Sequence, residues 1–100
     1  MDVQNWLLLF EKKLIIQRYS NATNENYKSC VSQFLQLASK KFIHPKHISA
    51  TDVEKYVFWL IKKKNIGDSY KRMTIASIEK FYSLVLNKTI NLKHLYPKRK

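Results

Sequence analysis

The sequence predicts an all-α fold, a bundle of four helices followed by a short C-terminal segment. Apolar residues recur at helical spacing in four separate stretches of the chain. Only 1 glycine and 2 prolines are present, and this scarcity of turn residues argues against an all-β fold. A chain of 100 residues with 45% hydrophobic residues is expected to form one domain with a single core.

The first helix is expected from about Asp2 to Arg18, with Asp2 at the positive end of the helix dipole. Its core stripe has helical spacing and consists of Val3, Leu7, Phe10 and Leu14. Further apolar residues widen this surface, namely Trp6, Leu8, Leu9, Ile15 and Ile16. Such a helix either packs on two sides or contacts another subunit.

The second helix is expected from about Ala22 to Lys40, with Ser20 or Asn21 as its cap. Its core face consists of Thr23, Tyr27, Val31, Phe34 and Ala38. The opposite face carries Glu25, Ser29, Ser32, Gln33 and Gln36, with Asn26 and Lys28 at its edges. Small hydroxyl and amide side chains allow a helix to approach a nucleic-acid groove closely.

The third helix is expected to begin at a capping box formed by Ser49 and Asp52 and to end near Lys64. Its buried stripe consists of Val53, Tyr56, Val57, Leu60 and Ile61. The lysines at 62–64 suit the negative end of the helix dipole, and they equally suit phosphate contact. Both interpretations stay open at this point.

The fourth helix is expected to start at a cap formed by Asp68 or Ser69 and to end near Asn87. Its core face consists of Ile75, Ile78, Tyr82 and Val85. The opposite face consists of Ser69, Met73, Ser77 and Lys80, with Arg72 at one edge and Leu84 nearby. After this helix, Ile90, Leu92 and Leu95 are expected to pack back on the bundle.

The charge balance indicates a polyanionic partner, because 19 Lys and Arg residues face 7 Asp and Glu residues, for a net charge of +12. Nucleic acid is the first candidate and an anionic membrane the second. The basic residues are spread over all the helices rather than gathered on one amphipathic face, which argues against the membrane.

Catalytic, metal and cofactor chemistry is not expected. Cys30 is the only cysteine and is interpreted as a buried, inert thiol in a cytoplasmic protein. His44 and His47 flank Pro45, and no second cysteine joins them as a metal ligand. Gly67 is the only glycine, so no glycine-rich phosphate loop exists.

Taken in order, the motifs resemble the N-terminal core-binding domain of tyrosine recombinases, the phage and integron-type integrases. The first motif is Tyr19, Ser20, Thr23 and Tyr27, leading to Phe34 and Leu35. Ile48, Ser49, Asp52, Val53 and Tyr56 follow, and then Ser69, Ile75, Ser77, Ile78, Phe81 and Tyr82. The resemblance implies a SAM-like bundle over residues 1–95 and the start of a basic interdomain linker over residues 96–100.

The family resemblance also implies which residues contact DNA. In the family the second and fourth helices lie against the major groove, as half of a C-shaped clamp. The positions that correspond here are Thr23, Asn26, Ser29, Gln33, Ser69, Arg72, Met73 and Ser77. Phosphate contacts are expected from Lys28, Lys71, Arg72, Lys80 and the terminal basic run. Thr23 lies near the core side and is expected to cap its helix or touch a phosphate.

Glu79 departs from the family pattern, since many relatives carry a basic residue there. A carboxylate repels phosphate, so Glu79 is excluded as a contact and is expected to pair with a lysine.

The main hypothesis is therefore a non-catalytic DNA-binding domain of a tyrosine recombinase or integrase, located in the cytoplasm with the nucleoid. The family's Arg, Lys, His-x-x-Arg and Tyr catalytic pattern is not found in this sequence, and Tyr27, Tyr56 and Tyr82 are assigned to the core. Double-stranded DNA is the expected partner, together with neighbouring protomers through the first helix. The alternative is a helical protein–protein adaptor or dimerisation module.

Overall fold

The computed structural model describes residues 1–96, and the expected linker residues 97–100 lie outside the described part of the chain. Four helices form the fold: α1 (Val3–Ile16), α2 (Asn21–Ala38), α3 (Ala50–Trp59) and α4 (Asp68–Leu86). Short turns η1 (Pro45–His47), η2 (Leu60–Lys64) and η3 (Lys93–Leu95) complete it. Within residues 1–96 there is no strand, so the predicted all-α class is confirmed.

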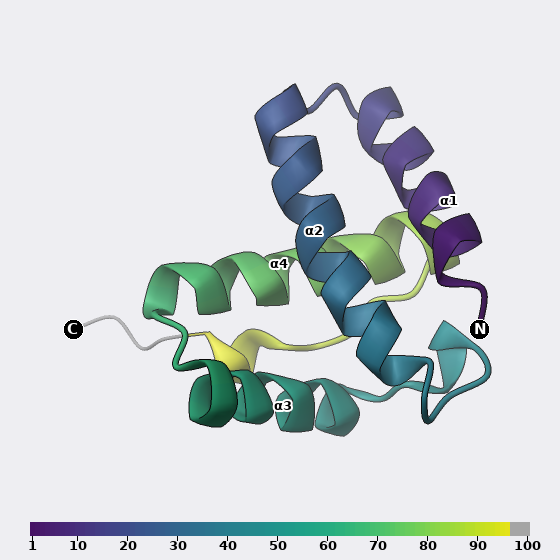
Figure 1. Cartoon of the computed structure of the whole chain (residues 1–100). Coiled ribbons are helices and arrows are strands. Elements are labelled where there is room, and N and C mark those ends of the chain that lie inside the picture. Colours follow the sequence, from purple (N-terminus) through teal and green to yellow (C-terminus); the bar gives the residue numbers. More distant parts are fainter. Residues whose placement is uncertain (97–100) are drawn as a thin grey trace.

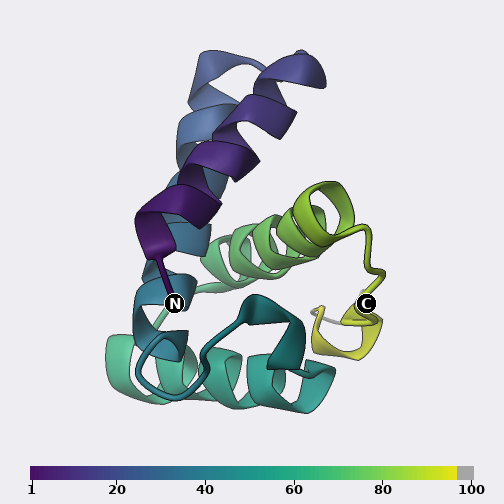
Figure 2. The same cartoon turned by 90° about the vertical axis from the view of Figure 1, so that its right-hand side faces the viewer.

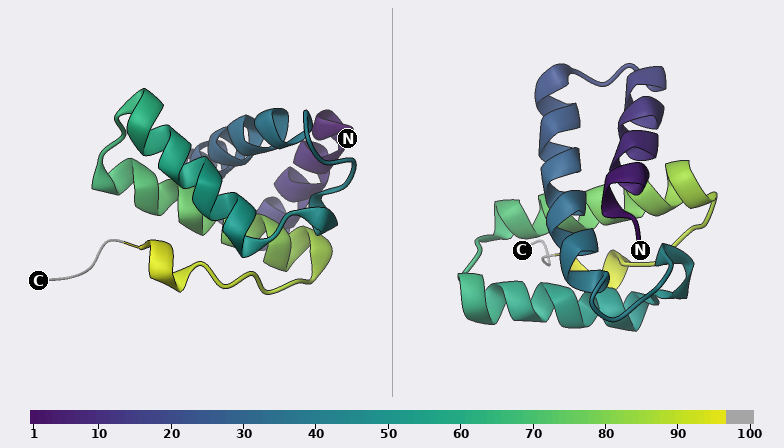
Figure 3. Two further views of the ribbon diagram at one scale, coloured as in Figure 1. Left: turned by 90° about the horizontal axis from the view of Figure 1, so that it is seen from below. Right: turned by 45° about the vertical axis from the view of Figure 1, so that its right-hand side comes forward.

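The helices form a hairpin of α1 and α2 above a second pair, α4 and α3 (Figure 1). α1 and α2 run antiparallel and stand on α4, while α3 lies along the base of the molecule (Figures 1 and 2). The segment after α4 turns back and runs alongside α4 (Figure 3). α4 therefore packs against the α1–α2 hairpin on one side and against the C-terminal segment on another, whereas α2 packs against α1 and α4 and keeps its outer face exposed.

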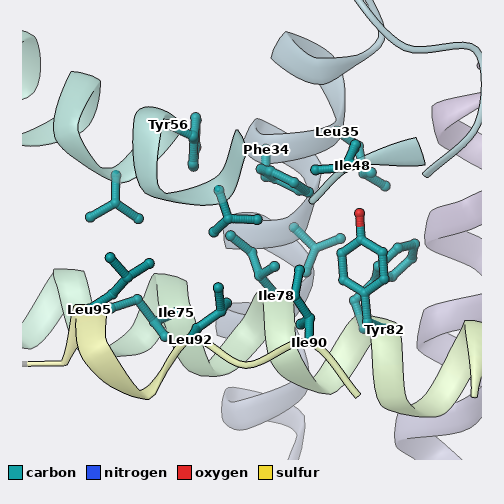
Figure 4. Packing of buried hydrophobic residues seen from close by; sticks show 14 of the residues in the cluster. Phe34, Leu35, Ile48, Tyr56, Ile75, Ile78, Tyr82, Ile90, Leu92 and Leu95 are labelled. Carbon is teal, nitrogen blue, oxygen red and sulfur yellow. The ribbon is translucent and has the colours of Figure 1, made fainter. Parts of the chain in front are cut away.

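One core joins all of these elements, and α4 supplies its centre. Figure 4 shows side chains from α2, α3, α4 and the C-terminal segment meeting in this interior. The ring of Phe81 packs edge-on against that of Phe10, with their centroids 5.6 Å apart. The buried hydroxyl of Tyr82 donates to the carbonyl of Pro45 at 2.8 Å and so ties α4 to the loop before α3. The expected packing of the C-terminal segment is confirmed, because Ile90, Leu92 and Leu95 are buried.

The predicted helix caps are confirmed for α2 and α3. The hydroxyl of Ser20 accepts from the backbone N–H of Thr23 at 3.2 Å. Ser49 and Asp52 form the capping box, in which the Ser49 N–H donates to the Asp52 carboxylate at 2.9 Å. This backbone hydrogen bond is the main cause that lowers the pKa of Asp52.

The predicted cap of α4 is wrong. Gly67 occupies the cap position in an extended conformation, Asp68 is already the first helical residue, and no side chain caps the helix. The third helix does extend to Lys64, as predicted, but its last turn, η2, is a π-helix. Asn65 ends that turn in the left-handed region, with φ of 52°.

Candidate nucleic-acid interface

The outer face of α2 is polar, as expected from its periodicity. Asn26, Ser29 and Gln33 are exposed on it. Thr23 is half-buried, and its hydroxyl accepts from the hydroxyl of Ser20 at 2.9 Å. Thr23 is therefore not the cap that was expected: Ser20 caps α2 and holds both the backbone N–H and the side chain of Thr23.

The outer face of α4 is richest in exposed polar residues at its N-terminal end. Ser69 and Arg72 are exposed there, while Lys71 and Met73 are half-buried. No side chain caps α4, so no capping side chain accepts a hydrogen bond from the backbone N–H groups of its first turn. Free N–H groups at a helix start are suited to phosphate, although Asp68 adds a negative charge in the same turn.

A hydrogen bond joins the outer faces of α2 and α4. The hydroxyl of Tyr70 donates to the side-chain carbonyl of Gln33 at 3.2 Å, across 37 positions of the chain. Tyr70 is 38% exposed and was not among the residues expected at this site. Sequence periodicity gave no signal for it, because the contact depends on how the two helices cross. We call the surface formed by Asn26, Ser29, Gln33, Ser69, Tyr70 and Arg72 the α2–α4 polar face.

The expectation that Ser77 lies on the outer face is wrong. Ser77 is fully buried, and its hydroxyl donates to the carbonyl of Met73 at 2.5 Å within the same helix. Thr74 and Phe81, which lie on the same side of α4, are buried as well. Because α4 packs on two sides, its buried arc is wider than the stripe of Ile and Val that the sequence displays, and Ser77 falls within it.

The expected phosphate ligands differ in how free their charges are. The ammonium of Lys28 pairs with Glu11 of α1 and lies 3.8 Å from Glu25. The hydrogen bond to Glu11 is the main cause that raises the pKa of Lys28. The half-buried Lys80 places its ammonium 5.3 Å from the centre of the Tyr19 ring. Arg72 is therefore better placed than Lys28 to meet a phosphate.

Two further expectations need correction. Glu79 does not pair with a lysine among residues 1–96; its carboxylate accepts from the hydroxyl of Tyr96 at 2.5 Å. This bond connects α4 to the end of the C-terminal segment. Tyr27 was expected in the core but is half-buried, with its ring 5.8 Å from that of Tyr19.

No group of His, Cys, Asp and Glu side chains in residues 1–96 is arranged to hold a metal ion. Cys30 is buried as expected, and burial raises the pKa of its thiol against the opposing effect of the Ser77 and Thr74 hydroxyls. In the same residues no helix is both long and apolar enough to pass through a membrane.

Four helices in this arrangement, with a polar face shared by α2 and α4, define a SAM-like helical domain. The sequence profile of the phage integrase N-terminal SAM-like domain matches residues 6–92. The chain belongs to this family, and it is an N-terminal domain of the tyrosine recombinase type.

A solved structure agrees with this assignment. The crystal structure of XerA recombinase superposes with a TM-score of 0.81 at 25% sequence identity, over 99% of this chain. The chain spans only 34% of the length of XerA. No match was found among curated proteins.

Proposed function

We propose that this domain binds duplex DNA through the α2–α4 polar face, as half of the clamp by which a tyrosine recombinase holds its recombination site. The observation that carries the proposal is the joining of two polar helix faces, through Tyr70 and Gln33, on a domain of net charge +12. XerA is a recombinase, and we infer the same class for the protein that uses this domain.

The proposed contacts are of two kinds, those made in the major groove of the DNA and those made to its phosphates. Asn26, Ser29 and Gln33 carry short polar side chains that suit the edges of bases or the sugar–phosphate backbone. Arg72 and Lys71 supply positive charge beside them, with Ser69 at the helix start. Thr23, Met73 and Lys80 stay in the proposed site at its margins. All three are half-buried, and the Thr23 hydroxyl and the Lys80 ammonium already have neighbours in the fold. Lys28 would have to leave Glu11 before it reached a phosphate, so its share is smaller.

The domain's role in this proposal is binding rather than catalysis, without a cofactor. Tyr56 and Tyr82 are buried, and burial raises the pKa of both hydroxyls. A nucleophilic tyrosine must instead be accessible and lose its proton readily. We propose residues 1–95 as the binding unit and residues 96–100 as the start of a linker.

The salt dependence of DNA binding tests this proposal. If the domain neutralises about four phosphates, the logarithm of the association constant should fall with the logarithm of salt concentration with a slope of about −3.6. Fluorescence anisotropy of a labelled duplex at several salt concentrations measures it. Salt-independent binding, or none at low salt, contradicts the proposal.

A second function, self-association through α1, is favoured by the apolar surface of that helix. Leu8, Ile15 and Ile16 are 62%, 58% and 64% exposed, and Leu9 is 44% exposed. An unpartnered apolar face of this kind commonly marks a protein contact. Neighbouring recombinase protomers are the partner we propose. Light scattering over a range of concentrations separates the two functions, because a tight dimer without DNA favours a dimerisation module.

A further inference from the structure

A groove runs between the C-terminal half of α2 and α3, away from the residues proposed to contact DNA except at Gln33. It consists of two adjoining hollows of about 310 and 280 Å³. Leu37, Tyr56 and Trp59 line both hollows and form the ridge between them. Each hollow is at or below the lower end of the range for small-ligand pockets, so each has room for side chains rather than for a large cofactor.

Much of the apolar lining of the groove is aromatic. The rings of Tyr56 and Trp59 are stacked, with centroids 6.2 Å apart and planes inclined by 21°. Phe34 packs against the other side of Tyr56 at 5.2 Å. Trp59 stays 37% exposed at the surface end of this aromatic row. A partly exposed tryptophan beside an apolar hollow is the type of residue that dominates binding energy at protein contacts.

The rim of the groove is basic. It carries four lysines, Lys40, Lys41, Lys55 and Lys64, all exposed. The ammonium of Lys64 lies 5.8 Å from the centre of the Trp59 ring. The one acidic residue in the lining, Asp52, has its carboxylate bonded to Ser49 in the capping box of α3. The groove therefore presents apolar surface between positive charges.

We propose that the α2–α3 groove binds an acidic amphipathic helix of another protein. Its apolar side chains would enter the two hollows on either side of the Leu37 ridge, and its carboxylates would meet the rim lysines. The lining of α3 extends from Asp52 to Trp59, a length of about 10 Å at 1.5 Å per residue. Two helical turns with anchors at i, i+4 and i+7 match that length.

Charge and chemistry favour this occupant over the others. A second copy of this chain would bring further positive charge to a basic rim, since the net charge is +12. A nucleic-acid backbone would satisfy the lysines but leave the hollows beside Phe34 and Leu37 without apolar partners. The groove meets the α2–α4 polar face only at Gln33, so the proposed partner differs from DNA in both its site and its chemistry.

Titration with a defined peptide tests the inference. The probe is a fluorescent helical peptide of about 14 residues, with Leu at i and i+4, Phe at i+7 and Glu on the flanking positions. We expect saturable binding with a Kd of about 10–100 µM, and a shift of the Trp59 indole N–H resonance. A matched peptide with Lys in place of Glu should not bind. Absence of binding by the acidic peptide overturns the proposal.

Two sets of variants locate the binding site. Lys40→Glu with Lys41→Glu should weaken peptide binding at least about tenfold. Lys12→Glu with Lys13→Glu places the same charge change on exposed positions of α1 and should weaken it far less. Trp59→Ala should weaken binding by about tenfold or more, with the fold checked by circular dichroism. Equal losses in both lysine pairs would indicate bulk charge attraction and overturn the site.

Competition with duplex DNA decides between the two classes of partner. We expect the Lys40 and Lys41 variant to lose no more DNA affinity than the Lys12 and Lys13 variant. Duplex DNA that displaces the peptide, together with a selective loss of DNA binding in the groove variant, would show that nucleic acid occupies the groove and would overturn the proposal.

Discussion

α2 and α4 both turn polar residues outward, yet their surroundings differ. α2 has a serine cap and pairs with α1 as a hairpin, whereas α4 begins at Asp68 without a side-chain cap and lies between the hairpin and the C-terminal segment (Figure 1). The outer face expected on α2 is exposed, with Asn26, Ser29 and Gln33 accessible. On α4 the expected outer residue Ser77 is buried. The exposed arc of a helix therefore depends on where its neighbours pack as well as on its own sequence.

Replacement of a residue on the inner side of α4 should have the largest effect. Phe81 is fully buried, and its ring contacts those of Phe10, Trp6 and Tyr82. Phe81→Ala should lower the free energy of unfolding by about 3–5 kcal/mol, because the cavity it leaves cannot collapse fully. Urea denaturation followed by circular dichroism measures this. A loss below about 1 kcal/mol would contradict the central position of α4.

The corresponding replacement on α2 should cost less. Tyr27 is half-buried at the edge of the core, against Tyr19. Tyr27→Ala should lower the free energy of unfolding by about 1–2 kcal/mol, since only part of the ring is removed from water. The same denaturation experiment applies. A loss as large as that of Phe81→Ala would mean that α2 is buried as widely as α4.

Replacement of Ser77 tests whether this residue is part of the interior of the domain and not of the DNA-binding surface. Its hydroxyl bonds within the helix, so Ser77→Ala should change the free energy of unfolding by less than about 1 kcal/mol. DNA affinity should stay within about twofold of the unaltered domain, which corresponds to about 0.4 kcal/mol. Anisotropy titration of a duplex measures the second quantity. A marked loss of DNA affinity without loss of stability would indicate that Ser77 contacts DNA.

The fold could be predicted from the sequence, because its signals are local. The helical spacing of apolar residues predicted four helices. Ser20 and Ser49 were recognisable as caps and marked where two of these helices begin. The polar face of α2 followed from the same period. The pattern of Ile75, Ile78 and Tyr82 marked one side of α4 as buried, but it could not show how far that burial extends.

The rest of the site depends on contacts between distant parts of the chain. Gln33 meets Tyr70, Lys28 meets Glu11 and Glu79 meets Tyr96 only after the helices have packed. None of these pairs has a spacing that a single helix would reveal. The helical spacing of polar residues identified the candidates. Tertiary packing determined which of them stay exposed and which are bonded to another side chain.

One measurement tests most directly the claim that the α2–α4 polar face binds DNA. The variant Ser69→Glu with Arg72→Glu should keep its fold, because both residues are exposed, and should bind duplex DNA at least about tenfold more weakly. The control, Gln4→Glu with Lys12→Glu, makes the same charge change at exposed positions of α1 and should lose much less affinity. Unchanged affinity in the first variant, or equal losses in both, would contradict the claim.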